Sequence, residues 1–172
     1  VHQHWENKIE KREDFHQQLK EEEQLLKSTP QEFEFNKYGG WENGPQLKAT
    51  KHFRVEKYND KWWFIDPSGK LFWSHGIDCV RSFASTPVTN REHYFEYLPE
   101  NNKTNSSLFS TRNGNSKGFY KDTPFSIYNF YQQNLVNKYG ADWQNEFNKI
   151  TTKRFKNWGI NTIGNWSDAA VY

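Results

Sequence analysis

Polar side chains and one indole ring follow two apolar stretches of the sequence, "SHGIDCVR" (residues 74–81) and "INTIG" (residues 160–164). The candidate residues at these two places are Asp78, Arg81, Asn165, Trp166 and Asp168. A carboxylate and a guanidinium can together bind hydroxyl groups, an amide both donates and accepts hydrogen bonds, and an indole offers a flat face for stacking. This combination of side chains favours a binding site for a ligand that carries hydroxyl groups.

Most of these residues also have a purely structural explanation. Asp78 and Arg81 could form a buried ion pair, and Asn165 could hold a loop in place. Trp166 could belong to the core, where an indole buries a large apolar area. His75, inside the first stretch, is as compatible with a hydrogen-bonded core position as with contact to a ligand. The prediction therefore concerns the cluster rather than any single member.

The two apolar stretches are predicted to be neighbouring parallel strands. The first reads as one continuous strand containing Gly76, which is typical of a strand covered on both faces. One helix that ends at Gly140, and a second that begins after Asp142 and ends at Gly159, precede the second strand. The apolar face of the second helix would consist of Trp143, Phe147, Ile150, Arg154 or Phe155, and Trp158. Because ligands of parallel sheets meet the carboxyl ends of the strands, the candidate residues are expected at one edge.

Upstream of the first strand, alternating apolar residues predict a small antiparallel β-meander over residues 53–73. Its turns would be Asn59-Asp60 and the segment that begins at Asp66 and ends at Gly69. A polar helix over residues 2–27, stopped by Ser28-Thr29-Pro30, precedes the meander.

Residues 82–122 are polar and far longer than a typical connection. They predict a loop, and loops of such length are usually functional or mobile.

Composition narrows the class of protein. The chain has 172 residues, a net charge of +2 and 34% hydrophobic residues, with eight Trp, nine Tyr and 14 Phe. The interspersed charges do not predict a nucleic-acid partner. A single cysteine, Cys79, excludes an internal disulfide and lies in an apolar run, so a buried thiol is expected. No stretch approaches the roughly 18 apolar residues of a membrane span. No metal or cofactor is predicted, and any export signal would lie upstream of Val1.

Four segments of the sequence carry a family resemblance. They are "YGGWENGP" (residues 38–45), "FRVEKYNDKWWFIDPSGKLFWSHGIDCVR" (residues 53–81), "TPVTNREHYFEYLPE" (residues 86–100) and "NKYGADWQNEFNKITTKRFKNWGINTIGNWSD" (residues 137–168). Together they cover most of residues 36–168. They resemble the start of the catalytic module of agarase-like glycoside hydrolases, glycoside hydrolase family 50 and its close relatives.

The resemblance implies an α/β fold, the amino-terminal portion of a (β/α)8 TIM barrel. "SHGIDCV" would be the first barrel strand and "INTIGNW" the second, preceded by the small meander and a linker helix. Residues 1–35 would link the module to an upstream sugar-binding-like domain. Residues 36–172 would be the start of the barrel, truncated after its second strand and expected to fold poorly alone, because open strand edges remain exposed.

The resemblance also implies hydrolysis of a β-linked galactan such as agarose by a retaining pair of glutamates on later strands. No carboxylate of this chain matches those glutamates, so no catalytic residue is predicted here and the chain alone is expected to be inactive. Its substrate-binding residues would be Asp78, Arg81, Asn165, Trp166, Asp168 and His75. Its partners would be a polysaccharide or oligosaccharide and the remainder of its own barrel, with neither nucleic acid nor membrane. The full-length protein would be secreted or periplasmic. A non-catalytic carbohydrate-binding module and an inactive structural fragment are the alternatives.

Overall fold

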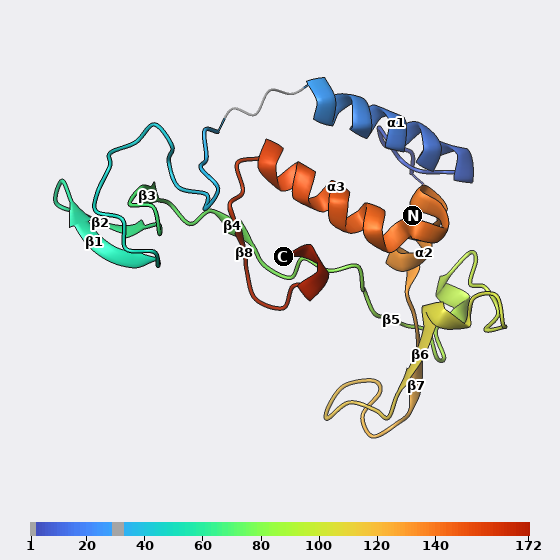
Figure 1. Ribbon diagram of the computed structural model, residues 1–172. Coiled ribbons are helices and arrows are strands. Elements are labelled where there is room, and N and C mark those ends of the chain that lie inside the picture. The colour runs from blue at the N-terminus through green and yellow to red at the C-terminus, as the bar shows by residue number, and fades with distance from the viewer. Residues whose placement is uncertain (1–2, 29–32) are drawn as a thin grey trace. The chain divides into compact units, whose positions relative to one another are not determined.

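The computed structural model describes residues 3–28 and 33–172. The chain divides into two compact units. Unit 1 comprises Val1–Phe15 and Ser82–Phe147, and unit 2 comprises His16–Arg81 and Asn148–Tyr172. The boundary between the units falls inside two helices, α1 (Arg12–Ser28) and α3 (Trp143–Asn157), which Figure 1 labels. Within the described residues, no helix combines the length and the hydropathy of a membrane span.

Helix α1 begins at Arg12, ten residues later than the sequence pattern predicts. The Asp14 carboxylate explains this start, because its Oδ2 accepts the backbone N–H of Glu10 at 2.9 Å and of Lys11 at 3.1 Å. The bond from Lys11, the residue directly before the helix, to the third helical residue is one half of a capping box. The two hydrogen bonds also lower the pKa of Asp14. The helix ends at Ser28, as predicted. Thr29 and Pro30, the rest of the predicted stop, lie outside the described residues.

The predicted β-meander is confirmed in unit 2. Strands β1 (Arg54–Tyr58), β2 (Lys61–Ile65) and β3 (Leu71–Phe72) form an antiparallel sheet in the order β1-β2-β3. The turn between β1 and β2 uses Asn59 and Asp60, with φ of 47° and 63°. Two consecutive positive φ angles match the right-handed twist of a two-residue hairpin, and Asn and Asp tolerate them better than most residues.

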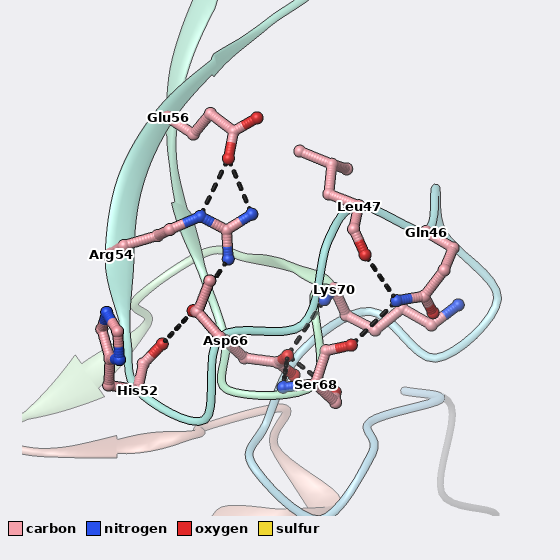
Figure 2. A network of polar contacts seen from close by, with 9 residues as sticks. Gln46, Leu47, His52, Arg54, Glu56, Asp66, Ser68 and Lys70 are labelled. Atoms are coloured by element: carbon pink, nitrogen blue, oxygen red, sulfur yellow. Dashed lines mark hydrogen bonds and ion pairs between the residues drawn. The ribbon is translucent and has the colours of Figure 1, made fainter.

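A buried aspartate holds the turn between β2 and β3. Asp66 is 0% exposed, and its Oδ1 accepts the Ser68 N–H at 2.8 Å, the Ser68 hydroxyl at 2.7 Å and the Lys70 N–H at 2.9 Å. Figure 2 shows Asp66 with these two partners. Oδ2 accepts the side-chain amide of Asn36. Gly40 has to be glycine here, because a Cβ would lie 2.3 Å from Oδ2. This turn thus ties the irregular segment before β1 to the sheet.

Strands β4 (Gly76–Ile77) and β8 (Thr162–Ile163) form the predicted parallel pair (Figure 1), with Gly76 opposite Thr162. The prediction of a long strand covered on both faces is wrong, because β4 has two residues and Gly76 is exposed. A Cβ on Gly76 would lie 2.7 Å from the Thr162 carbonyl oxygen. The close approach of the neighbouring strand, rather than cover on two faces, explains this glycine.

Two helices precede β8, as predicted. Helix α2 (Phe130–Tyr139) begins after Asn129, whose Oδ1 accepts the Gln132 N–H at 3.0 Å, and it is followed by Gly140 at a φ of 75°. On α3 the buried residues include Phe147, Ile150 and Phe155, all from the predicted face. Trp158 is 55% exposed, contrary to the prediction, because it lies beyond the last helical residue.

Residues 82–122 of unit 1 contain more structure than the predicted loop. They supply β5 (Thr86–Pro87) and β6 (Phe109–Arg112), which flank β7 (Phe125–Tyr128) in a sheet of order β5-β7-β6. Strand β6 escaped prediction because its last three residues are exposed and polar, so apolar alternation is missing. The buried residues of this unit include Val88, Leu108, Tyr128, Tyr120, Phe125 and Ile127.

Candidate functional site

Backbone hydrogen bonds continue the pairing of β4 and β8 beyond the two strands. The Gly164 N–H donates to the Ile77 carbonyl at 2.8 Å, and the Cys79 N–H donates to the Asn165 carbonyl at 2.9 Å. The Asp168 N–H then donates to the Val80 carbonyl at 2.8 Å. The carboxyl ends of the two strands are therefore held side by side. As predicted, the segments that carry Asp78 and Asp168 meet at one edge.

The two strands end in the same way. Cys79 has a φ of 57° and Trp166 a φ of 56°, a conformation that non-glycine residues seldom adopt. In both turns the side chain of the preceding residue accepts the backbone N–H. Asp78 Oδ1 accepts the Cys79 N–H, and Asn165 Oδ1 accepts the Trp166 N–H, each at 2.9 Å. Such strained backbone clusters at functional sites. Cys79 itself is exposed, so the expectation of a buried thiol is wrong.

Ser167 joins the two strand ends through its side chain. Its hydroxyl accepts the Val80 N–H at 3.0 Å and donates to the Gly164 carbonyl at 2.9 Å. The residue lies between Trp166 and Asp168 and fixes the backbone of both. The sequence analysis did not single out Ser167. A small hydroxyl residue between two candidates, directly after a strand, is the only signal that could have found it.

Trp166 and Asn165 both face solvent in unit 2. The Trp166 indole is 68% exposed, so it lies on the surface of this unit and not in its core. Asn165 is exposed as well. Its side-chain Oδ1 accepts the Trp166 N–H, which agrees with the alternative that Asn165 holds a loop in place. Its side-chain nitrogen Nδ2 makes no hydrogen bond to any described residue. The side chain can therefore fix the turn and still donate to a ligand.

Asp78 and Arg81 do not form the buried ion pair that was the structural alternative. Both residues are exposed, and no ion pair joins them in the described part of the chain. Asp168 is half-buried, and its backbone carbonyl accepts the Val171 N–H at 3.1 Å. Asp78 retains acceptor capacity beyond its one bond to Cys79, since a carboxylate offers about four lone pairs.

His75 lies at the other end of the strand pair. It precedes β4, and its Nδ1 is 3.2 Å from the Gly159 carbonyl oxygen. Because a carbonyl only accepts, Nδ1 donates and Nε2 is the acceptor of the neutral ring. The side chain is exposed and lines a cavity of about 270 Å³, together with aromatic residues that include Trp41, Trp63 and Trp73. The structure thus does not bring His75 to the five other candidates.

Asn161 is a second residue that the sequence analysis missed. Its Nδ2 donates to the carbonyls of Gly39 and Trp73, each at 2.9 Å, and its Oδ1 accepts the His75 N–H at 3.0 Å. One amide therefore fastens the amino ends of both strands to the segment before β1. No sequence motif marks it, since an Asn before a short strand is common in loops.

The functional groups at the two strand ends are suited to binding a ligand. The strand ends offer a carboxylate oxygen, an amide and an exposed indole, which suit hydroxyl groups and a flat ring face. Among residues 3–28 and 33–172, no three side chains of His, Cys, Asp or Glu gather in a way that could hold a metal ion.

Comparison with known proteins gives close relatives. The chain is 32% identical to beta-agarase B of Vibrio sp. (strain JT0107), over 98% of this chain and 20% of that protein. It is 30% identical to beta-agarase A of the same strain, over 64% of this chain and 11% of that protein. The chain thus spans about a fifth or less of the curated relatives it matches. No protein-family profile matches the sequence.

Solved structures agree with the sequence relatives. PfGH50B superposes with a TM-score of 0.85 at 31% identity, over 99% of this chain and 27% of that one. An exo-beta-agarase superposes with a TM-score of 0.84 at 27% identity, over 98% of this chain and 28% of that one. The agarase AgWH50C superposes with a TM-score of 0.79 at 26% identity, over 96% of this chain and 26% of that one. The predicted resemblance to agarase-like glycoside hydrolases of family 50 is confirmed in sequence and in structure.

Proposed function

We propose that this chain is part of the catalytic module of a glycoside hydrolase that cleaves a β-linked galactan such as agarose. The observation that carries the proposal is the extent of the likeness, since proteins named as beta-agarases match 98% of the chain in sequence and 98% in structure. The exposed Trp166 at a strand end adds a chemical reason, because an indole face can stack on a sugar ring.

In the proposed architecture, β4 and β8 are the first two strands of a (β/α)8 barrel. Their parallel pairing supports this, because barrel strands are parallel and ligands meet their carboxyl ends. Residues 36–172 form the start of the barrel module, and residues 1–35 link it to an upstream domain. The remainder of the barrel is then the partner of this segment, and a secreted or periplasmic location would give the enzyme access to polysaccharide.

The proposed mechanism is retaining hydrolysis by two glutamates from later strands, with carboxyl groups about 5 to 5.5 Å apart. This segment binds the substrate instead. Trp166 stacks on a sugar ring, and Asn165 donates to a hydroxyl through its amide nitrogen. Asp78, Asp168 and Arg81 hold further hydroxyls. The 172-residue chain alone should accordingly release no reducing sugar from agarose.

The test replaces Trp166 in the intact enzyme by Ala and by Phe. Loss of the ring should lower kcat/KM on agarose oligosaccharides by about ten- to a hundredfold, which corresponds to about 1.4 to 2.7 kcal/mol. Trp166→Phe keeps a stacking ring and should retain most of the activity. The melting temperature should change little in both, because the indole is 68% exposed. A large fall in Tm of Trp166→Ala with unchanged kinetics would instead place the indole in the core of the complete protein.

A non-catalytic carbohydrate-binding role is the second candidate. Trp62 and Trp73 favour it, because they are 71% and 72% exposed on unit 2 and lie outside the strand-end cluster. Saturable binding of agarose oligosaccharides by an intact protein that does not shorten them would support this role over hydrolysis.

A further inference from the structure

Arg91 in unit 1 rests on two aromatic rings. Its guanidinium carbon is 4.7 Å from the centre of the Phe119 ring and 5.0 Å from that of Tyr120. Among the described residues, no carboxylate forms an ion pair with it. The adjacent Glu92 points elsewhere, because its Oε1 accepts the Asn90 N–H at 3.2 Å. Arg91 is half-buried, so this cation is partly desolvated without a counter-charge.

The rings under Arg91 are held in place. Tyr120 is 4% exposed, and its ring stacks on Phe125 with centroids 4.3 Å apart and planes 20° apart. Its hydroxyl donates to the Thr89 carbonyl at 2.7 Å. The backbone is fixed as well, since the Asn115 N–H donates to the Tyr120 carbonyl at 2.8 Å. Arg91 is therefore presented by a preorganised support, which lowers the entropic cost of binding.

The segment that carries the rings is basic. Residues 101–121 contain four cationic residues and neither Asp nor Glu. The four are Lys103, Arg112, Lys117 and Lys121. Phe119, within this segment, is 64% exposed. Glu100 and Asp122 flank this segment and the net charge of the whole chain is only +2, so the excess of positive charge is confined to residues 101–121. It attracts an anionic group to the part of the chain where an aromatic ring is open to solvent.

We propose that Arg91 and Phe119 form a binding site for a saccharide unit that bears an oxyanion, either a sulfate half-ester or a carboxylate. The Arg91 guanidinium lies near both rings and has no anionic partner, so its N–H groups can donate two parallel hydrogen bonds to oxyanion oxygens. The exposed ring of Phe119 stacks on the sugar that carries the group. The saccharide part of this inference rests on the proposed function, whereas the oxyanion part rests on Arg91 and the charges alone.

The test measures binding to the intact protein by calorimetry at low salt. The probes are galactose, a galactose sulfate ester, galacturonate and inorganic sulfate. We expect the sulfate ester or galacturonate to bind at least about tenfold more tightly than galactose. Arg91→Gln should abolish this preference, and Arg91→Lys should keep only part of it, because an ammonium cannot bind in the bidentate way. Arg12→Gln, at the exposed start of α1 and outside the basic segment, is the matched control and should keep the preference.

A second variant separates the two parts of the inference. Phe119→Ala removes an exposed ring, so the fold should persist, and it should weaken binding of the sulfate ester but not of inorganic sulfate. Equal binding of galactose and its sulfate ester, or an unchanged preference in Arg91→Gln, would overturn the proposal. Tighter binding of a single-stranded oligonucleotide than of any saccharide would overturn it in favour of a nucleic-acid phosphate. Absence of agarose hydrolysis by the intact protein, with the preference for the charged saccharide present, would count against the proposed function alone.

Discussion

Asp66 and Asp78 each follow a strand of unit 2, and each accepts hydrogen bonds from backbone N–H groups that come after it in the chain: Asp66 from Ser68 and Lys70, Asp78 from Cys79. Their surroundings differ. Asp66 is 0% exposed and accepts four hydrogen bonds, three of them at Oδ1. Asp78 is exposed and accepts one, from Cys79. The first carboxylate is saturated by its own fold, while the second has acceptor capacity left for a ligand.

The comparison separates a carboxylate that builds the fold from one that can serve a site. A buried acceptor with several partners is costly to remove, because each donor left behind loses its hydrogen bond in a place that water does not reach. Removal of an exposed acceptor with one partner costs less, because water can accept the hydrogen bond of the single donor that is left behind. The same residue type after a strand can therefore have opposite roles, and exposure together with the number of bound donors decides between them.

The largest effect is expected for Asp66→Ala. It should lower the free energy of unfolding by about 3 kcal/mol, because several partly buried donors lose their acceptor at once. Urea denaturation of the intact protein measures this. Asp78→Ala is the matched control and should change the free energy of unfolding by less than about 1 kcal/mol. Equal losses in the two variants would remove the distinction drawn between these aspartates.

A smaller effect is expected for Asp78→Asn. The amide oxygen can still accept the Cys79 N–H, so the turn should persist, whereas the negative charge disappears. If Asp78 binds substrate hydroxyls, kcat/KM on agarose oligosaccharides should fall by up to about tenfold while Tm stays within a degree or two. Steady-state kinetics and thermal denaturation of the same preparation measure both quantities. Unchanged kinetics would assign Asp78 to the turn alone.

The smallest effect concerns pH. Burial alone would raise the pKa of Asp66, but hydrogen bonds from Asn36, Ser68 and Lys70 outweigh it and lower the pKa below its ordinary value of 3.8. A depressed pKa in the folded state contributes stability above the unfolded value, and that contribution is lost as pH falls through the folded one. Stability of the wild type should thus decline below about pH 4, and Asp66→Asn should show a shallower decline. Parallel declines would indicate that other carboxylates dominate.

The regular parts of the fold could be predicted from the sequence. The alternation in residues 53–73 predicted the meander, and Gly140 and Gly159 marked helix ends correctly. The parallel pairing of β4 and β8 also followed from the pattern. The sheet in unit 1 did not, because β6 exposes most of its side chains and so lacks apolar alternation. The start of α1 was missed because a single side chain, Asp14, sets it.

The candidate site was predictable in its location and less so in its detail. The segments that carry Asp78 and Asp168 meet as the strand order required. His75 lies at the opposite end of β4, because a residue before a strand and a residue after it cannot share an edge. Ser167 and Asn161 act through bonds between segments far apart in the chain. Such bonds leave no periodicity in a sequence.

The left-handed backbone at Trp166 and the large side chain that it carries make opposite demands on this position. At a φ of 56°, glycine is the residue that the backbone favours, and a large side chain there costs stability. The backbone conformation therefore gives no reason for an indole at this position. The reason for the ring has to lie in what its exposed face contacts. In the proposed function, that contact is the sugar ring on which Trp166 stacks at the strand end.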